Sequence, residues 1–263
     1  MNRVNKELIE LCKKEYYDKP LIVPFGKIDE DENVYMDFTN VSGLFIAGST
    51  ASGKSVFIDD IILSLIHKNK SSDIKLCLID PKEIELNEYN GLNYVIGGKS
   101  EYDIVEIGNL LNSINQEINE RTQKLVDNHS RNITGYNDSN NEKLPHIFVI
   151  VDEGEDILNY ENIREILERI LDVGDNVGVH LIFSTNAYLK DYVESKFLDR
   201  FKYRLSFDMA SKEQSDLIGI KKAHWLSANG EAIIKSFNDK FYKFQAPFTA
   251  LETNKDVKPY IIK

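Results

Sequence analysis

The sequence predicts an α/β fold in which a mostly parallel central sheet is flanked by helices and preceded by a β-hairpin. Short apolar runs typical of buried strands alternate with longer segments whose apolar residues recur at helical spacing. The glycine-rich stretch 48–55, GSTASGKS, stands between such a strand at 43–47 and such a helix at 56–66. Strand, glycine-rich loop and helix in this order indicate one repeating unit of a parallel sheet.

Length and composition are those of one large globular domain. The chain has 263 residues, of which 42% are hydrophobic, and a net charge of −11. No apolar run is long enough to span a membrane and the N-terminus has no signal-peptide core, so we expect a cytoplasmic protein. Cys12 and Cys77 lie far apart and indicate reduced thiols, not a metal or disulfide pair. Because the chain is acidic, any contact with nucleic acid must come from a local patch.

The predicted elements follow one another along the whole chain. Residues 1–20 are predicted to form a short helical arm and residues 21–263 a single domain. The hairpin is predicted from strands at 21–27 and 34–38. Further strands are predicted at 43–47, 74–80, 147–151, 178–186, 203–207 and 231–235, and helices at 56–66, 102–127 and 157–173. The asparagine-rich stretch between His129 and Lys143 is predicted to be a loop.

The glycine-rich stretch matches the phosphate-binding loop, in which Gly and Gly-Lys-Ser/Thr are separated by four residues. Gly48 and Gly53 allow backbone angles and a close approach that leave successive N–H groups free to point at phosphate oxygens. Lys54 is expected to reach the β- and γ-phosphates and Ser55 to hold Mg²⁺. The expected ATP-binding residues are Gly48, Ser49, Thr50, Ala51, Ser52, Gly53, Lys54, Ser55 and Val56. A glycine turn with an exposed lysine is the alternative, which the following helix N-terminus disfavours.

A second motif lies at residues 147–153, where five apolar residues run into Asp152 and Glu153. Nucleoside triphosphatases use such an acidic strand end, so Asp152 is expected to hold Mg²⁺ through water and Glu153 to polarise the attacking water. The strand at 178–186 is expected to lie between the acidic and the glycine-rich strands and to present Asn186 to the γ-phosphate.

Two other polar residues stand in strand-like runs. Asp80 follows the strand predicted at 74–79, and an acidic residue at the end of a parallel strand points at the ligand-binding edge of such sheets. His180 lies inside an apolar run, and we interpret it as a structural histidine rather than a catalyst.

Taken in order from about Phe25 onward, these residues resemble the FtsK/SpoIIIE-type DNA translocases. The most specific piece is the segment 79–92, IDPKEIELNEYNGL, because general triphosphatases lack it. Segments 131–137 and 144–153 add to the resemblance, which covers the motor ATPase core only. It implies a RecA-like P-loop NTPase core, ATP hydrolysis with Mg²⁺, and a homohexameric ring that threads double-stranded DNA. The chain departs from the family pattern at Asn186, where Gln-Arg-Pro usually begins, and at Asp175, where an arginine is usual.

Two functions remain open at this point. The first is an ATP-driven motor that translocates double-stranded DNA, favoured by segments 79–92 and 131–137. The alternative is an ATP-dependent ring or coupling module for protein secretion or assembly, favoured by the acidic balance. Salt dependence separates them, because contacts to DNA phosphates weaken steeply as salt rises.

The motor hypothesis assigns roles to three arginines. An arginine from a neighbouring subunit would stabilise the charge of the transition state, and Arg200 and Arg204 are the candidates. Surface salt bridges are the alternative for both. The stretch 128–143 is expected to contact DNA phosphates through Arg131 and its neighbours, whereas the alternative is that Arg131 only holds this stretch to its own domain.

Overall fold

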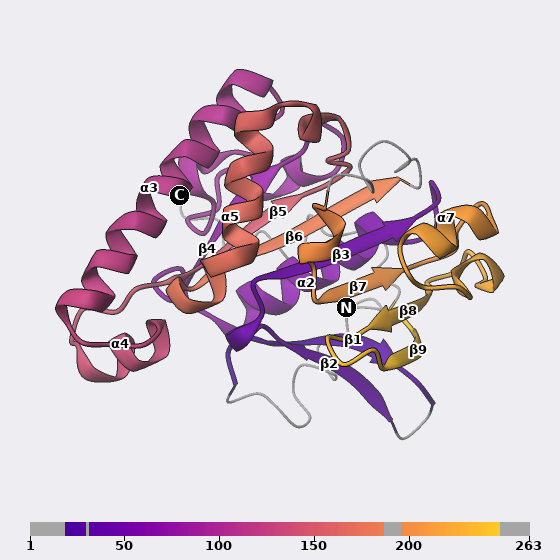
Figure 1. Cartoon of the computed structure of the whole chain (residues 1–263), viewed down its shortest axis with the longest axis horizontal. Coiled ribbons are helices and arrows are strands. Elements are labelled where there is room, and N and C mark those ends of the chain that lie inside the picture. The colour runs from indigo at the N-terminus through magenta and orange to yellow at the C-terminus, as the bar shows by residue number, and fades with distance from the viewer. Residues whose placement is uncertain (1–18, 30–31, 187–195, 248–263) are drawn as a thin grey trace.

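The computed structural model describes residues 19–29, 32–186 and 196–247, and within them the strands form one sheet of nine (Figure 1). The strand order is β2-β1-β9-β8-β7-β3-β6-β5-β4. The helical arm predicted at 1–20 lies almost entirely outside the described residues, so the division into arm and domain stays a prediction.

Strands and helices alternate through the first two thirds of the sequence, as predicted. The strands are β1 (Ile22–Lys27), β2 (Asn33–Asp37), β3 (Gly43–Gly48), β4 (Ile74–Ile79), β5 (His146–Val151), β6 (Val179–Asn186), β7 (Tyr203–Ser206), β8 (Glu231–Lys235) and β9 (Phe241–Gln245). The α-helices are α2 (Lys54–Lys68), α3 (Ile104–Asp127), α4 (Ile133–Ser139), α5 (Glu161–Val177) and α7 (Lys212–Leu217). Short 3-10 turns include η2 (Leu86–Tyr89) and η4 (Asp156–Asn159). None of the described helices has the length and apolar character needed to cross a membrane.

The sheet has a parallel half and an antiparallel half. Strands β4, β5, β6, β3 and β7 run parallel, whereas β8 and β9 and the hairpin of β1 and β2 pair antiparallel. The prediction that β6 lies between the glycine-rich strand β3 and the acidic strand β5 is confirmed. The loop after β3 and the acidic turn after β5 therefore emerge at the same edge of the sheet, which we call the carboxyl edge.

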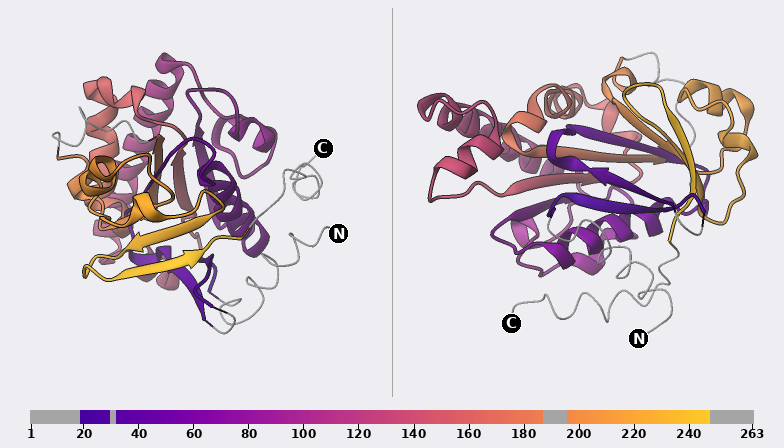
Figure 2. Two further views of the ribbon diagram at one scale, coloured as in Figure 1. Left: turned by 90° about the vertical axis from the view of Figure 1, so that its right-hand side faces the viewer. Right: turned by 90° about the horizontal axis from the view of Figure 1, so that it is seen from below.

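Alternate side chains of the parallel strands enter two separate cores because successive residues of a strand point to opposite faces. Val149 and Val151 pack with the apolar faces of α3 and α5, while Phe148 and Ile150 pack with α2 on the other side. The view from below in Figure 2 shows these helices as layers on the two faces of the sheet. With both faces covered, strands such as β5 are apolar throughout, which is why the sequence reveals them clearly.

The prediction of a loop between His129 and Lys143 is wrong, because this stretch contains the two-turn helix α4. The side chain of Asn132 caps the helix by accepting a hydrogen bond from the backbone N–H of Gly135 at 3.0 Å. Ile133 and Tyr136, one turn apart, are buried in the core. Two apolar residues are too few to show a helical period in the sequence.

Strand β9 and helix α7 are also absent from the predicted elements. In β9, Phe244 is the one buried residue among exposed neighbours, so the alternation is too short to recognise. Helix α7 has six residues, of which Ser215 is buried. Both elements depend on tertiary contacts rather than on local pattern.

Candidate nucleotide-binding site

The glycine-rich stretch forms a tight loop between β3 and α2 at the carboxyl edge. Gly53 has φ 113°, a left-handed angle that favours glycine, and Ala51 has φ 61°. A Cβ on Gly48 would lie 2.9 Å from Cβ of Phe207, so only glycine fits there. Helix α2 begins at Lys54 without a side-chain cap, which leaves the N–H groups of its first turn open to an anion.

The side chain of Lys54 folds back over this loop. Its Nζ donates to the carbonyl oxygens of Gly48 at 2.8 Å and Ser49 at 3.0 Å, and to Oδ1 of Asn186 at 2.8 Å. The residue is 4% exposed. Burial lowers the pKa of the ammonium group, and nearby carboxylates, chiefly that of Glu153, act in the opposite direction. Lys54 is therefore a buried cation at the centre of the loop and not an exposed lysine.

Asn186, the residue predicted to face the γ-phosphate, lies beside Lys54 at the carboxyl edge. Asn186 is the last residue of β6 and pairs in register with Gly48, the last residue of β3. Its amide oxygen reaches the Lys54 ammonium group across the adjacent strand. The pairing of β3 with β6 thus brings Asn186 next to Lys54, although the two residues lie far apart in the sequence.

The acidic turn follows β5 and faces the same loop. Asp152 is 1% exposed, and burial raises its pKa to about 6, although a hydrogen bond from Ser184 opposes this rise. The hydroxyl of Ser184 on β6 donates to Oδ1 of Asp152 and accepts from the backbone N–H of Glu153 at 3.0 Å. Glu153 has φ 48°, an uncommon angle for a residue with a side chain.

The residues present fit a nucleoside triphosphate with Mg²⁺. The hydroxyl oxygens of Ser49 and Ser52 are buried and have no hydrogen-bond partner within the described part of the chain, as expected for groups that await a ligand. Lys54 and the first turn of α2 supply cationic and N–H donors for phosphates. The Ser55 hydroxyl and the Asp152 carboxylate are oxygen ligands of the kind that Mg²⁺ prefers.

The segment after β4 packs beside the acidic turn at the carboxyl edge. Both carboxylate oxygens of Asp80 accept backbone N–H groups of its own loop, including those of Glu85 at 2.9 Å and Leu86 at 3.0 Å. Asp80 thus lies at the carboxyl edge, as predicted, with its carboxylate engaged by its own loop. Lys82 forms an ion pair with Asp156 of the turn after β5 at 3.0 Å.

Tyr89 connects the same segment to helix α2, a contact that the sequence did not predict. Its hydroxyl donates to Oδ1 of Asp59 at 2.8 Å, and both side chains are buried. Burial raises the pKa of Asp59 to about 7. No sequence signal reveals this pair, because thirty residues and a strand separate its members.

Arg200 and Arg204 lie at the amino end of β7, away from the loop that follows β3. Arg200 forms ion pairs with Asp172 at 2.5 Å and Glu168 at 3.3 Å on α5. Arg204, which pairs in register with Phe45, forms an ion pair with Asp199 at 3.0 Å. Neither arginine reaches the site of its own chain, so the expected role requires a second subunit.

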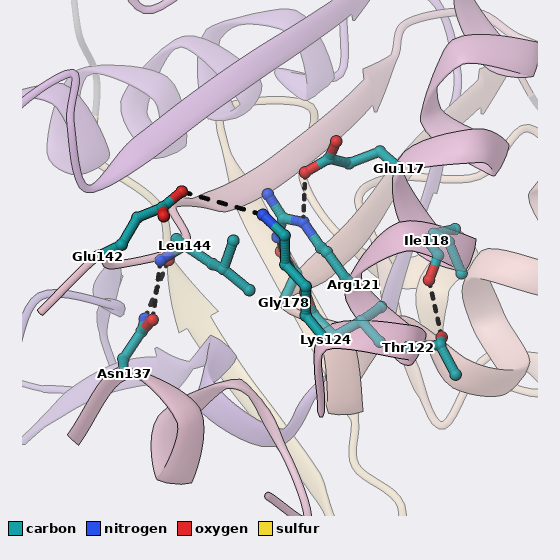
Figure 3. A network of polar contacts seen from close by, with 10 residues as sticks. Glu117, Ile118, Arg121, Thr122, Lys124, Asn137, Glu142, Leu144 and Gly178 are labelled. Atoms are coloured by element: carbon teal, nitrogen blue, oxygen red, sulfur yellow. Dashed lines mark hydrogen bonds and ion pairs between the residues drawn. The ribbon is translucent and has the colours of Figure 1, made fainter. Parts of the chain in front are cut away.

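The region of α4 lies at the other end of the parallel strands, the amino edge (Figure 1). Arg131 is exposed and has no hydrogen bond or ion pair among the residues that the structure describes. Asn137 is instead bonded to the backbone of Leu144 at 2.8 and 2.9 Å, as Figure 3 shows. Arg121 in the same figure is buried and donates to the carbonyl oxygen of Val177 at 2.9 Å, at the C-terminal end of α5.

His180 is a structural histidine, as we predicted. Its Nδ1 lies 2.7 Å from the carbonyl oxygen of Val41, and its Nε2 lies 2.9 Å from Nδ1 of His146. Since a carbonyl only accepts, Nδ1 of His180 carries the hydrogen, and Nδ1 of His146 must donate to Nε2 of His180. Burial lowers the pKa of His180 to about 4 and that of His146 to about 3.

A family model and individual relatives point to the same protein family. The model of the FtsK/SpoIIIE family matches residues 7–194. The DNA translocase SpoIIIE of Bacillus subtilis is 30% identical over 225 residues, covering 81% of this chain and 28% of that protein. The DNA translocase FtsK of Staphylococcus aureus strain Mu50 is 29% identical over 283 residues, covering 98% of this chain and 35% of that protein. The chain thus spans about a third of the length of these relatives.

Solved structures with low sequence identity share the fold. The cytoplasmic domain of the type VII secretion ATPase EccC of Thermomonospora curvata has a TM-score of 0.83 at 18% identity, covering 97% of this chain and 32% of that one. The pCW3 conjugation coupling protein TcpA with ATPγS has a TM-score of 0.79 at 19% identity, covering 95% and 72%. The expected α/β P-loop NTPase fold is confirmed.

Proposed function

Because the chain belongs to the FtsK/SpoIIIE family, we propose that it is an ATP-hydrolysing motor that translocates double-stranded DNA. One observation carries this proposal: the phosphate-binding loop, the Asp152 turn and Asn186 converge at the carboxyl edge around the buried Lys54 ammonium group. A complete set of hydrolytic groups in one place is what the chemistry of phosphoryl transfer requires.

Each group has a defined task in this proposal. Lys54, whose ammonium group donates to the carbonyl oxygens of Gly48 and Ser49, would turn to phosphate oxygens when a nucleotide binds. Mg²⁺ held by Ser55 and Asp152 would neutralise the phosphate charge. Glu153 orients the attacking water and accepts its proton, and Asn186 contacts the γ-phosphate from β6. Asp152 and the backbone of Glu153 are already held by Ser184, which lowers the reorganisation that hydrolysis requires of the acidic turn.

Assembly and DNA contact complete the proposal. A homohexameric cytoplasmic ring would place Arg200 or Arg204 of one subunit beside the nucleotide of the next, and these arginines lie at the edge opposite their own loop. Arg131 and the adjoining residues 128–143 would contact DNA phosphates, since Arg131 is exposed and engaged with no described residue.

The second candidate is an ATP-dependent ring or coupling module for protein secretion or assembly. The net charge of −11 favours it, because a duplex would have to be held against an acidic protein. The EccC structure, described as a type VII secretion ATPase, shares the fold with this chain. The family membership favours the DNA motor.

The test measures the ATPase rate of the purified protein with and without duplex DNA, over a range of salt concentrations and of protein concentrations. The DNA motor predicts stimulation by duplex DNA that falls steeply as salt rises, and a rate per subunit that rises with protein concentration. An ATPase rate that duplex DNA leaves unchanged at low salt would reject the DNA motor in favour of the second candidate. A protein that neither binds nor hydrolyses ATP would reject both.

A further inference from the structure

Three consecutive residues at the end of β6 contact both halves of the site. Asn186 bonds to Lys54 of the phosphate-binding loop. Thr185 donates to Oε2 of Glu155 at 3.0 Å, and Ser184 bonds to both Asp152 and Glu153 of the acidic turn. The motifs recognised in the sequence assign a role to Asn186 alone, so the other two residues are unexplained.

Ser184 forms hydrogen bonds with three consecutive residues of the acidic turn. Its hydroxyl hydrogen goes to Oδ1 of Asp152, which leaves the oxygen lone pairs for the backbone N–H of Glu153. Its carbonyl oxygen accepts the N–H of Gly154 at 3.0 Å. Ser184 is completely buried, so water does not replace these bonds when the hydroxyl is removed.

The turn that Ser184 contacts depends on outside support. Glu153 has φ 48°, a left-handed conformation that is unfavourable for a residue with a side chain. At Gly154 an added Cβ would lie 2.7 Å from Cε2 of Phe183 and would overlap Val151, so the turn is pressed against both strands. The bond from the Glu153 N–H to the Ser184 hydroxyl stabilises this left-handed backbone conformation.

Ser184 also determines which oxygen of Asp152 is available. Oδ1 is occupied by the hydroxyl, whereas Oδ2 accepts no hydrogen bond from any residue that the structure describes. A carboxylate held by one oxygen cannot rotate freely, so its other oxygen keeps a constant direction. This is the arrangement by which an outer hydrogen bond orients a metal ligand.

We propose that Ser184 is a positioning residue that orients Asp152 toward Mg²⁺ and holds Glu153 in its left-handed conformation. This inference rests on the proposed ATP hydrolysis but concerns a residue that does not touch the nucleotide. It predicts that loss of the hydroxyl weakens the response to Mg²⁺ and slows turnover, while the affinity for ATP without Mg²⁺ stays unchanged.

The experiment compares Ser184→Ala with Ser184→Thr, which keeps the hydroxyl, and with Ser206→Ala as a matched control. Ser206 is an equally buried serine on β7 whose hydroxyl bonds only to the carbonyl oxygen of Phe207. For each variant, four quantities are measured: kcat, the half-saturating Mg²⁺ concentration, the affinity for a fluorescent ATP analogue with and without Mg²⁺, and the melting temperature.

We expect Ser184→Ala to raise the half-saturating Mg²⁺ concentration about 10-fold and to lower kcat 10- to 100-fold, with Mg²⁺-free affinity within about twofold of wild type. Ser184→Thr should restore part of both losses, and Ser206→Ala should show neither. A Ser184→Ala protein that loses melting temperature but keeps the wild-type Mg²⁺ response would overturn the proposal. If wild type hydrolyses no ATP, the proposed function fails, while the Mg²⁺ dependence of analogue binding still decides about Ser184.

Discussion

Lys54 at the carboxyl edge of the parallel sheet and Arg131 at its amino edge are cations in opposite surroundings. At the carboxyl edge, Lys54 and Asp152 are almost completely buried and bonded to groups on neighbouring strands. At the amino edge, Arg131 is exposed and makes no contact with another charged or polar group of the described residues. A buried and bonded cation suits chemistry that depends on fixed positions, whereas an exposed cation suits contact with a flexible or variable surface.

The largest expected effect at the carboxyl edge is on turnover. Glu153→Gln should lower kcat by about 10²- to 10⁴-fold, because an amide cannot accept the proton of the attacking water. ATP should still bind with Mg²⁺, because Asp152 and Ser55 remain. The measurement is steady-state ATPase activity beside the affinity for a fluorescent ATP analogue.

Lys54→Ala serves as the matched comparison, because it should weaken ATP binding itself by removing the buried cation that contacts the loop. If Glu153→Gln turned over ATP at the wild-type rate, the assignment of Glu153 would be wrong. The carboxyl edge would then lack the group proposed to activate water.

A second prediction concerns the buried histidine pair of the amino edge, His146 and His180. His146 and His180 have pKa values lowered by burial to about 3 and about 4, below their usual 6.5. The unfolded chain therefore binds more protons as pH falls below 6.5, and the stability that the pair contributes above this pH is lost on acidification toward pH 4. We expect a loss on the order of 5 kcal/mol in the free energy of unfolding between pH 6.5 and pH 4 from the two histidines together.

Urea unfolding at a series of pH values measures this loss. The variant His146→Gln, whose amide N–H₂ can donate to Nε2 of His180, should show a shallower dependence on pH in this window. His129→Gln, at an exposed position of the same edge, is the control and should follow wild type. An equal dependence on pH for His146→Gln and wild type would show that the pair does not titrate with unfolding.

The smallest expected effect belongs to Arg131. If the amino edge contacts DNA, Arg131→Ala should reduce the slope of log affinity against log salt by about 1 and lower DNA-stimulated ATPase activity a few-fold. Basal ATPase activity and melting temperature should change little, because the side chain is exposed. Lys240→Ala, at an exposed position in the turn before β9, is the matched control.

An Arg131→Ala protein that melts at a lower temperature but keeps the salt slope would show that Arg131 is structural. The DNA-contacting surface would then have to be sought on other described cations, and the contrast between the two edges would rest on burial alone.

The sequence predicted the parts of the molecule whose signals are local. Strands such as β5, apolar on both faces, and the loop from Gly48 to Ser55 carry their pattern within a few residues. The position of β6 between the glycine-rich and acidic strands also followed from the motifs, although the bond from Lys54 to Asn186 did not.

What the sequence did not reveal depends on partners far away in the chain. In the sequence, Ser184 is an ordinary polar residue of a buried strand. Only the structure shows its two bonds to the acidic turn. Asp80 resembles a ligand-binding carboxylate by position, but its own loop uses both oxygens. Helix α4 escaped prediction because its stability comes from one cap and two buried side chains.

The order of strands also bears on how the chain folds as it is synthesised. Strand β3 has two neighbours in the sheet, β6 and β7, and both are made long after it. While the ribosome adds the residues before Val179, β3 has neither partner, so the loop that follows it cannot take its place beside Asn186. Fragments that end before β6 should expose the unpaired edges of an apolar strand and aggregate. The nucleotide site would thus be among the last parts of the described domain to form during synthesis, although its loop lies early in the sequence.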